Sequence, residues 1–126
     1  MGENNLKERE YMKVYQLENH NGNAWANQFV VHFDKYNIDI LQSYKSLVAL
    51  LDYNEHHITL GDDYDYSNTT AKAVRKFMAD NGITAGVPEL RKALKSGELV
   101  DDYGETWSVA SGCDSFFEDF FTIGEK

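Results

Sequence analysis

The stretch Gly61–Gly82, GDDYDYSNTTAKAVRKFMADNG, constrains the fold most, because the spacing of apolar residues changes within it. Before this stretch apolar residues alternate, as in strands, whereas after Ser67 they recur at the spacing of a helix: Ala71, Val74, Phe77 and Met78. Ser67 is a favourable N-cap, since its hydroxyl can accept a backbone N–H of the first turn. Gly82 is a favourable residue just past the end, since it turns left-handed without a Cβ clash. The sequence therefore predicts a helix over Ser67–Asn81, preceded by an acidic loop.

The residues before this helix predict an antiparallel meander. The Asn21-Gly22 dipeptide is a strong hairpin signal, and short turns separate the other apolar runs. We expect about five strands over residues 12–60: Lys13–Leu17, Trp25–Phe33, Ile38–Gln42, Leu47–Asp52 and His57–Leu60.

The residues after this helix predict a second helix and a less regular end. Pro88 suits the first turn of a helix and Gly97 its C-terminal end. Glu105–Val109 is a candidate edge strand, and Asp114–Phe121 a short amphipathic helix with four Phe residues on one side. The predicted fold class is α+β, an antiparallel β-meander of about five strands with two or three α-helices packed on one face.

We expect residues 1–126 to form a single domain. Its expected parts are a flexible segment at 1–11, the β-meander at 12–60, two helices at 67–97, and an acidic and aromatic C-terminal segment at 98–126.

The run from Gln42 to Met78 resembles a family of small uncharacterised proteins from bacteriophages and mobile elements. That family shares a strand with the letters QSY, a hairpin, the letters DYS and TT, and a helix that ends in Phe. The matching positions are Gln42, Ser43, Tyr44, Asp65, Tyr66, Ser67, Thr69, Thr70 and Phe77. The resemblance implies a phage or plasmid accessory protein, and it implies no chemistry for these positions.

The charge is strongly negative and unevenly spread. The formal net charge is -9, from 12 Lys and Arg against 21 Asp and Glu. Residues 72–97 hold six basic and two acidic side chains, whereas residues 98–126 hold one basic and eight acidic ones. Free nucleic acid is therefore a poor partner for the surface as a whole, and a basic protein groove is a better one. The basic block also has a simpler interpretation, as the solvated faces of two helices.

No pattern in the sequence predicts catalysis, a metal or a cofactor. Asp63, Asp65, Ser67 and Thr69 alternate like calcium ligands, but the position that requires Gly is Asn68 and the position that requires Glu is Val74. No phosphate-binding loop, nucleophile elbow or HExxH motif is present. The sequence predicts a protein that is not an enzyme.

Compartment and membrane association follow from equally simple features. The single cysteine permits no intrachain disulfide, which fits a reducing cytoplasm. No apolar run approaches the roughly 20 residues that a membrane span needs, and the N-terminus lacks the apolar core of a signal peptide. We therefore expect a cytoplasmic protein that does not associate with membranes.

These features lead to a hypothesis of function. We expect a non-enzymatic phage-type binding protein that inhibits a host nucleic-acid-binding defence protein, such as a CRISPR nuclease, by mimicking DNA. Acidic side chains would replace phosphates and aromatic ones would replace bases. The candidate contact residues are Asp62, Asp63, Asp65, Asp101, Asp102, Tyr103, Glu105, Trp107, Glu118 and Asp119.

Two other functions stay open. One is a small regulatory protein that binds DNA or RNA through the basic helix pair at residues 67–97. The other is a phage accessory protein with a structural role.

Overall fold

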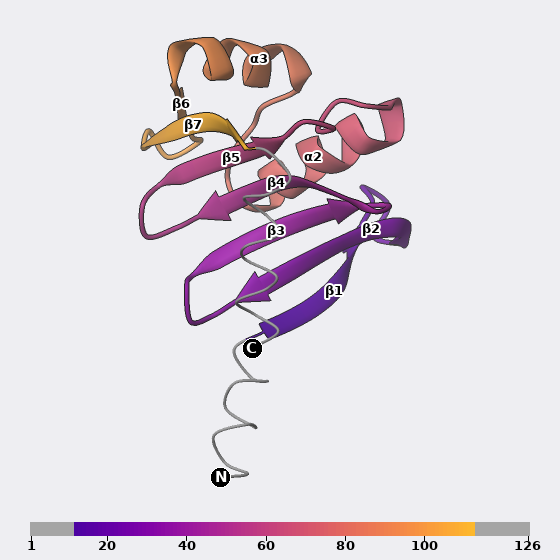
Figure 1. Ribbon diagram of the computed structural model, residues 1–126. Coiled ribbons are helices and arrows are strands. Elements are labelled where there is room, and N and C mark those ends of the chain that lie inside the picture. The colour runs from indigo at the N-terminus through magenta and orange to yellow at the C-terminus, as the bar shows by residue number, and fades with distance from the viewer. Residues whose placement is uncertain (1–11, 113–126) are drawn as a thin grey trace, which may run out of the picture.

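The antiparallel meander forms most of the sheet in the computed structural model, which describes residues 12–112. Each strand pairs with the one before it (Figure 1). Gly22, in the first turn, has a φ of 81°, which the Asn-Gly signal anticipates. The predicted meander is therefore confirmed. Its strands are β1 (Met12–Glu18), β2 (Ala24–Phe33), β3 (Ile38–Ser43), β4 (Ser46–Asp52) and β5 (His57–Gly61).

Two further strands extend the sheet beyond the predicted five. They are β6 (Glu98–Val100) and β7 (Thr106–Gly112), and the strand order is β1-β2-β3-β4-β5-β7-β6. The strand predicted at Glu105–Val109 exists, but it lies inside the sheet, parallel to β5, and the short β6 forms the edge. A parallel pair needs a long crossover connection, and the two helices between β5 and β6 supply it.

The two predicted helices are confirmed, α2 (Asn68–Asp80) and α3 (Val87–Ser96). Their ends follow the capping signals, since the Ser67 hydroxyl accepts the Thr70 N–H at 3.1 Å and Gly82 is left-handed with a φ of 79°. Pro88 lies in the first turn of α3. Neither described helix is long and apolar enough to cross a bilayer. The segment 1–11, the helix predicted at Asp114–Phe121, Glu118 and Asp119 lie outside the described residues.

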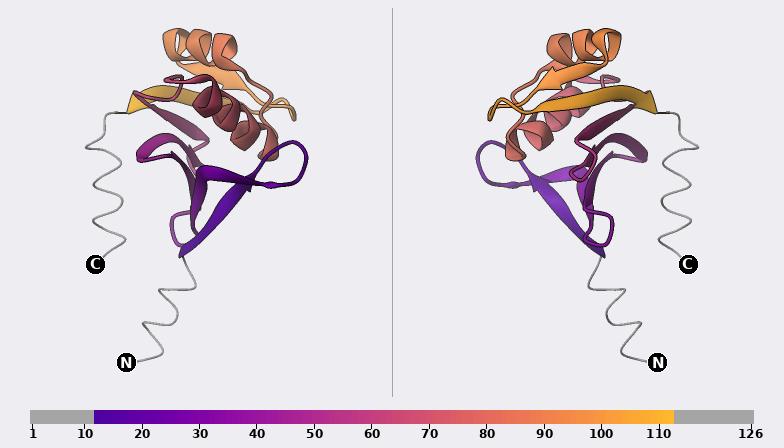
Figure 2. Two further views of the ribbon diagram at one scale, coloured as in Figure 1. Left: turned by 90° about the vertical axis from the view of Figure 1, so that its right-hand side faces the viewer. Right: turned by 90° about the vertical axis from the view of Figure 1, so that its left-hand side faces the viewer.

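The main core lies between the helices and one face of the sheet. Phe77 and Met78 of α2 pack with strand residues such as Leu41 and Leu51, and α3 adds Leu90 to the same cluster. Figure 2 shows both helices on the same side of a strongly twisted sheet. A second buried cluster on the opposite face consists of Val31, Phe33, Ile38, Ile40 and Leu50. The fold is thus α+β, with a mostly antiparallel seven-stranded sheet.

Candidate functional site

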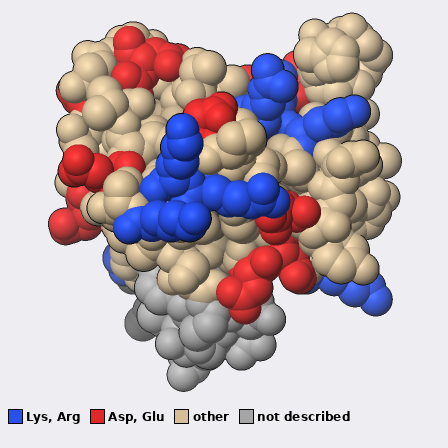
Figure 3. Space-filling view, turned by 90° about the horizontal axis from the view of Figure 1, so that it is seen from above, with Lys and Arg blue, Asp and Glu red and all other residues tan. Residues whose placement is uncertain are grey.

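Charge is separated in the described part of the molecule. Residues 12–112 carry nine Lys and Arg, and six of these lie between residues 72 and 97, on α2 and α3. Seen from the α3 side, Lys and Arg side chains gather near the middle of the surface and Asp and Glu side chains surround them (Figure 3). The sheet and its loops carry most of the negative charge.

One group of candidate acids lies in the loop between β5 and α2, residues 62–66. The backbone passes unusually close to β4 at Gly61, where an added Cβ would lie 2.2 Å from the Leu47 carbonyl oxygen. Tyr64 anchors the loop, since it is only 8% exposed, whereas Tyr66 projects outward and is 81% exposed. Glycine and a buried tyrosine therefore fix a loop that displays a second tyrosine.

The carboxylates of this 62–66 loop have different surroundings. Asp63 accepts a hydrogen bond from the Ser46 hydroxyl at 3.0 Å, and Asp65 pairs with Arg91 of α3 at 3.2 Å. Asp62 is exposed and makes no hydrogen bond or ion pair with any residue of the described chain. An open cavity of about 690 Å³ lies between this loop and the β3–β4 turn, where Tyr44 is half exposed.

The second group of candidate acids lies in the β6–β7 loop, residues 101–105, where Asp101 holds the loop together. Its carboxylate accepts the Tyr103 and Glu105 backbone N–H groups and the Trp107 indole N–H, each at 2.9 Å. The hydrogen bond from Trp107 is the main reason that the pKa of Asp101 lies below its ordinary value, and the two backbone N–H groups add to it. Asp101 therefore has a structural role.

The remaining candidates at this end of the sheet, in the 101–105 loop and at Trp107 of β7, also divide into residues that hold the structure together and residues that are exposed. Asp102 accepts the Thr84 hydroxyl at 2.9 Å and the Thr84 backbone N–H at 3.2 Å, which ties the loop to the α2–α3 connector. Trp107 is 4% exposed and belongs to the core. Tyr103, by contrast, is 82% exposed, and Glu105 is exposed within 3.4 Å of His56. Asp102 is exposed as well but is bound to Thr84, so Tyr103 and Glu105 are the exposed side chains that do not hold the loop in place.

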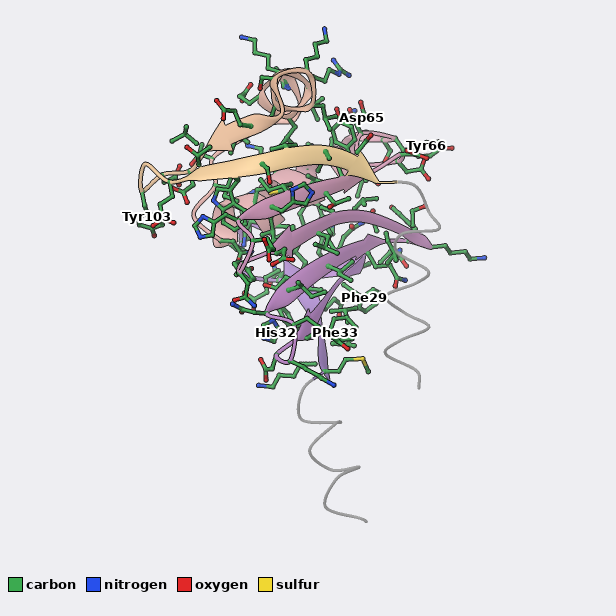
Figure 4. All side chains as sticks on the ribbon, turned by 60° about the vertical axis from the view of Figure 1, so that its left-hand side comes forward. Phe29, His32, Phe33, Asp65, Tyr66 and Tyr103 are labelled. Carbon is green, nitrogen blue, oxygen red and sulfur yellow. The ribbon has the colours of Figure 1, made fainter. Side chains whose placement is uncertain are left out.

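The structure places these two loops at opposite ends of the same strand pair. In the parallel β5–β7 pair, His57 faces Ser108 and Gly61 faces Gly112, so one loop precedes β7 and the other follows β5. Figure 4 shows Tyr103 at one end of this pair and Asp65 and Tyr66 at the other. Five strand residues at 3.3 Å each separate the loops by about 17 Å. The candidate residues thus form two clusters.

A buried polar network was not anticipated from the sequence. Asp39, which is 6% exposed, contacts His32 Nδ1 and the Tyr53 hydroxyl, each at 2.5 Å. The Tyr53 hydroxyl also lies 2.7 Å from the Asn81 side-chain oxygen, and His32 Nε2 contacts Asp34. The network connects the β2–β3 hairpin to the end of α2. Hairpin register would have placed His32 opposite Asp39, because the turn between β2 and β3 is short.

The contacts within this network shift the pKa values of His32 and Tyr53 and leave no free imidazole nitrogen. Burial alone would lower the pKa of His32. Its contacts with Asp39 and Asp34 raise the pKa by more than burial lowers it, so the net shift is upward. Burial, and then Asp39, raise the pKa of Tyr53. Both imidazole nitrogens of His32 already contact carboxylates, so neither is available to accept a proton from a substrate.

The His32 network does not form a metal site, because Asp39 contacts Nδ1 and Asp34 contacts Nε2, and the two carboxylates do not converge on one point. Among residues 12–112 no three His, Cys, Asp or Glu side chains form a group that could hold a metal ion.

Comparison with known proteins gives a family and no function. Residues 12–93, about two thirds of the chain, match the family of unknown function DUF8033, and the chain belongs to this family. The match covers β1 to most of α3, including the 62–66 loop, and ends before the 101–105 loop. No curated protein and no solved structure matches the chain.

Proposed function

We propose that this protein is a non-enzymatic, acidic binding protein that occupies the basic groove of a nucleic-acid-binding protein. The observation that carries the proposal is the pair of acid–tyrosine clusters at the two ends of the β5–β7 pair. Each cluster combines a tyrosine that is more than four-fifths exposed, Tyr66 or Tyr103, with exposed carboxylates. Carboxylates replace phosphates, and tyrosine rings offer an apolar face with a polar end where a base would lie.

The spacing of the clusters agrees with such a role. About 17 Å separates the two loops, and one DNA strand advances about 3.4 Å per phosphate, so the clusters span about five nucleotides. Grooves that bind single strands contact about 4–16 nucleotides, so this span lies within the length of such a groove. The net charge of -9 adds long-range attraction to such a groove.

The proposed partner and cellular context rest on a resemblance in the sequence. The resemblance of residues 42–78 to proteins of bacteriophages and mobile elements supports a defence protein of the host, such as a CRISPR nuclease, as the partner. The inhibitor would then act in the host cytoplasm, in the manner of an anti-CRISPR protein.

A pull-down from host lysate, with and without nuclease treatment, tests the proposal. We expect a basic nucleic-acid-binding protein in both samples, and DNA should compete for that protein. Raising the salt concentration from about 50 to 200 mM should slow association strongly, because steering is screened beyond about 10 Å. Affinity that does not change with salt, together with a ternary complex containing DNA, would refute mimicry.

Charge reversal then locates the contact surface. Asp62→Lys with Glu105→Lys changes one accessible carboxylate in each cluster and spares Asp101 and Asp102, which hold the 101–105 loop. The matched control, Lys92→Glu with Lys95→Glu on α3, changes the same number of charges elsewhere. We expect much weaker binding only in the first variant. Equal binding by both variants contradicts the assignment.

The basic helix faces support a second candidate function, binding of DNA or RNA through α2 and α3. Six of the nine Lys and Arg in residues 12–112 lie on these helices. The observation that would favour it is nucleic acid recovered directly in the pull-down, with the complex lost after nuclease treatment.

A further inference from the structure

A cavity of about 560 Å³ lies between the tip of the β1–β2 hairpin and the outer side of α2. We call it the hairpin cavity. Its volume is in the range of small-molecule sites, roughly 300–1,000 Å³. The residues that line it are Asn19, His20, Trp25, Lys72, Arg75, Lys76 and Ala79.

The backbone of the hairpin beside the cavity is irregular. The β1–β2 register shifts between Gln16 and Glu18, and Asn27 has a φ of 66°, a left-handed conformation that asparagine tolerates. Such a bulge bends a strand and increases its twist. Figure 2 shows the hairpin tip reaching toward α2 on the helix side of the sheet. Trp25, near the start of β2, lines the cavity together with the basic residues of α2.

Three cations face the hairpin cavity from one side of α2. Lys72, Arg75 and Lys76 occupy positions i, i+3 and i+4, where like charges repel each other and weaken a helix. Lys76 pairs with Asp80 at 2.5 Å. Lys72 and Arg75 are exposed and form no ion pair with any residue in 12–112. Two such cations in an acidic protein are available to an external anion.

An aromatic surface faces these cations. Trp25 is half-buried and packs against the main core, which fixes the position of its indole. Asn19 holds the adjoining turn, since its side-chain oxygen accepts the backbone N–H groups of Asn21 and Asn23 at 2.9 and 3.1 Å. Stacking of a base on an aromatic side chain contributes about 1–3 kcal/mol in other proteins. Fixed cations beside a fixed indole suit a ligand with a phosphate and a base.

We propose that the hairpin cavity binds a nucleoside monophosphate, with its phosphate on Lys72 and Arg75 and its base on Trp25. Neither acid–tyrosine cluster contributes a lining residue, so the site is independent of the proposed inhibitory surface. The same chemistry has two sources, a free nucleotide or one residue of a single strand. The acidic surface favours the free nucleotide, because a small ligand experiences the local cations while a long strand also meets the remaining carboxylates.

Isothermal titration calorimetry with purified protein tests the site. The probes are adenosine 5′-monophosphate, adenosine, inorganic phosphate and a ten-residue oligo(dA). We expect the monophosphate to bind at least about tenfold tighter than adenosine or phosphate, because only it uses both halves of the site. Phosphate or adenosine binding as tightly as the monophosphate would overturn the proposal, as would no binding of monophosphate or oligonucleotide at millimolar concentration.

Two variants and a matched control localise the binding. Lys72→Glu with Arg75→Glu, and separately Trp25→Leu, should each weaken monophosphate binding by about tenfold or more. Lys92→Glu with Lys95→Glu makes the same change in net charge on α3 and should leave the affinity within about twofold. Equal weakening by both double variants would overturn the site. Melting temperatures verify that each variant is folded.

The oligonucleotide titration identifies the source. Tighter binding of oligo(dA) than of the monophosphate, lost with Lys72→Glu and Arg75→Glu, supports the site and assigns it to a single strand. Tighter binding of the monophosphate supports it as a site for free nucleotides. No partner protein is needed, so the titration succeeds or fails separately from the pull-down.

Discussion

Removing the Tyr53 hydroxyl should measure how strongly the buried polar network joins the sheet to α2. The hydroxyl lies 2.5 Å from Asp39 and 2.7 Å from the Asn81 side-chain oxygen, and Asn81 in turn donates to the Phe77 carbonyl at 2.8 Å. A phenol has one proton, so it donates to one of these oxygens at a time, and the carboxylate is the stronger acceptor. Tyr53→Phe removes this donor and keeps the ring.

The expected loss follows from the surroundings of Asp39. This side chain is buried, so water does not easily replace the missing donor. A hydrogen bond to a charged group contributes about 1.5–3 kcal/mol, and the Asn81 oxygen adds nothing to the loss while the phenol proton is donated to Asp39. The ring keeps its edge contact with Trp107, so no cavity term is added. We expect Tyr53→Phe to lower the free energy of unfolding by about 2–3 kcal/mol, out of about 5–15 kcal/mol for a typical domain.

Urea unfolding at pH 7, followed by tryptophan fluorescence, measures this loss. The slope of free energy against urea should stay constant, because the exposed area on unfolding does not change. A double-mutant cycle with Asp39→Asn should show a coupling energy of about 1 kcal/mol or more. The control is Tyr36→Phe, whose hydroxyl makes no hydrogen bond with a described residue and which should change stability by less than about 0.5 kcal/mol. A similarly small change for Tyr53→Phe would refute the network as a source of stability.

Four further predictions concern the same fold. The pKa of His32 is higher in the folded protein than its value of about 6.5 in the unfolded chain, so its contribution to stability is complete below pH 6.5 and is lost as pH rises through the folded pKa. The urea midpoints of His32→Gln and wild type should therefore differ most at acidic pH. Phe77→Ala should cost about 3–5 kcal/mol in urea unfolding, since the ring is 1% exposed, and an unchanged midpoint would mean that the wrong helix face was assigned to the core. Ser67→Ala should lose about 1 kcal/mol and Ser67→Gly clearly less, and equal small losses would contradict the cap. Gly61→Ala should lower the melting temperature, because the new methyl group collides with the Leu47 carbonyl, and an unchanged melting temperature would contradict that close approach.

The parts of the fold that the sequence predicts are those decided by neighbouring residues. Alternation and, for β4, a continuous apolar run mark the first five strands. The Asn-Gly turn marks the first hairpin, and Ser67 and Gly82 mark the ends of α2. The placement of β7 is different, because its partner strand lies about fifty residues earlier. No local pattern shows that β7 inserts beside β5 or that the three residues of β6 form the edge.

The roles of the acidic residues show the same limit. A count of carboxylates treats Asp101 and Glu105 alike, yet one carboxylate binds three N–H groups of its own loop and the other is exposed. The backbone hydrogen bonds of Asp101 could have been predicted from the sequence, because Asp followed three residues later by Gly is typical of a turn in which the aspartate accepts backbone N–H groups. The hydrogen bond to the Trp107 indole could not, since it depends on the position of β7.

The hairpin cavity depends on both kinds of information. The spacing of Lys72, Arg75 and Lys76 is local and places three cations on one side of a helix. Their aromatic counterpart, Trp25, lies almost fifty residues earlier, and only the fold shows that the β1–β2 hairpin brings it to the same cavity. From the sequence alone, a basic helix face is equally well explained by solvation. The β1–β2 hairpin supplies the other side of the cavity, and a pair of cations becomes a candidate binding site when an aromatic side chain lines the same cavity.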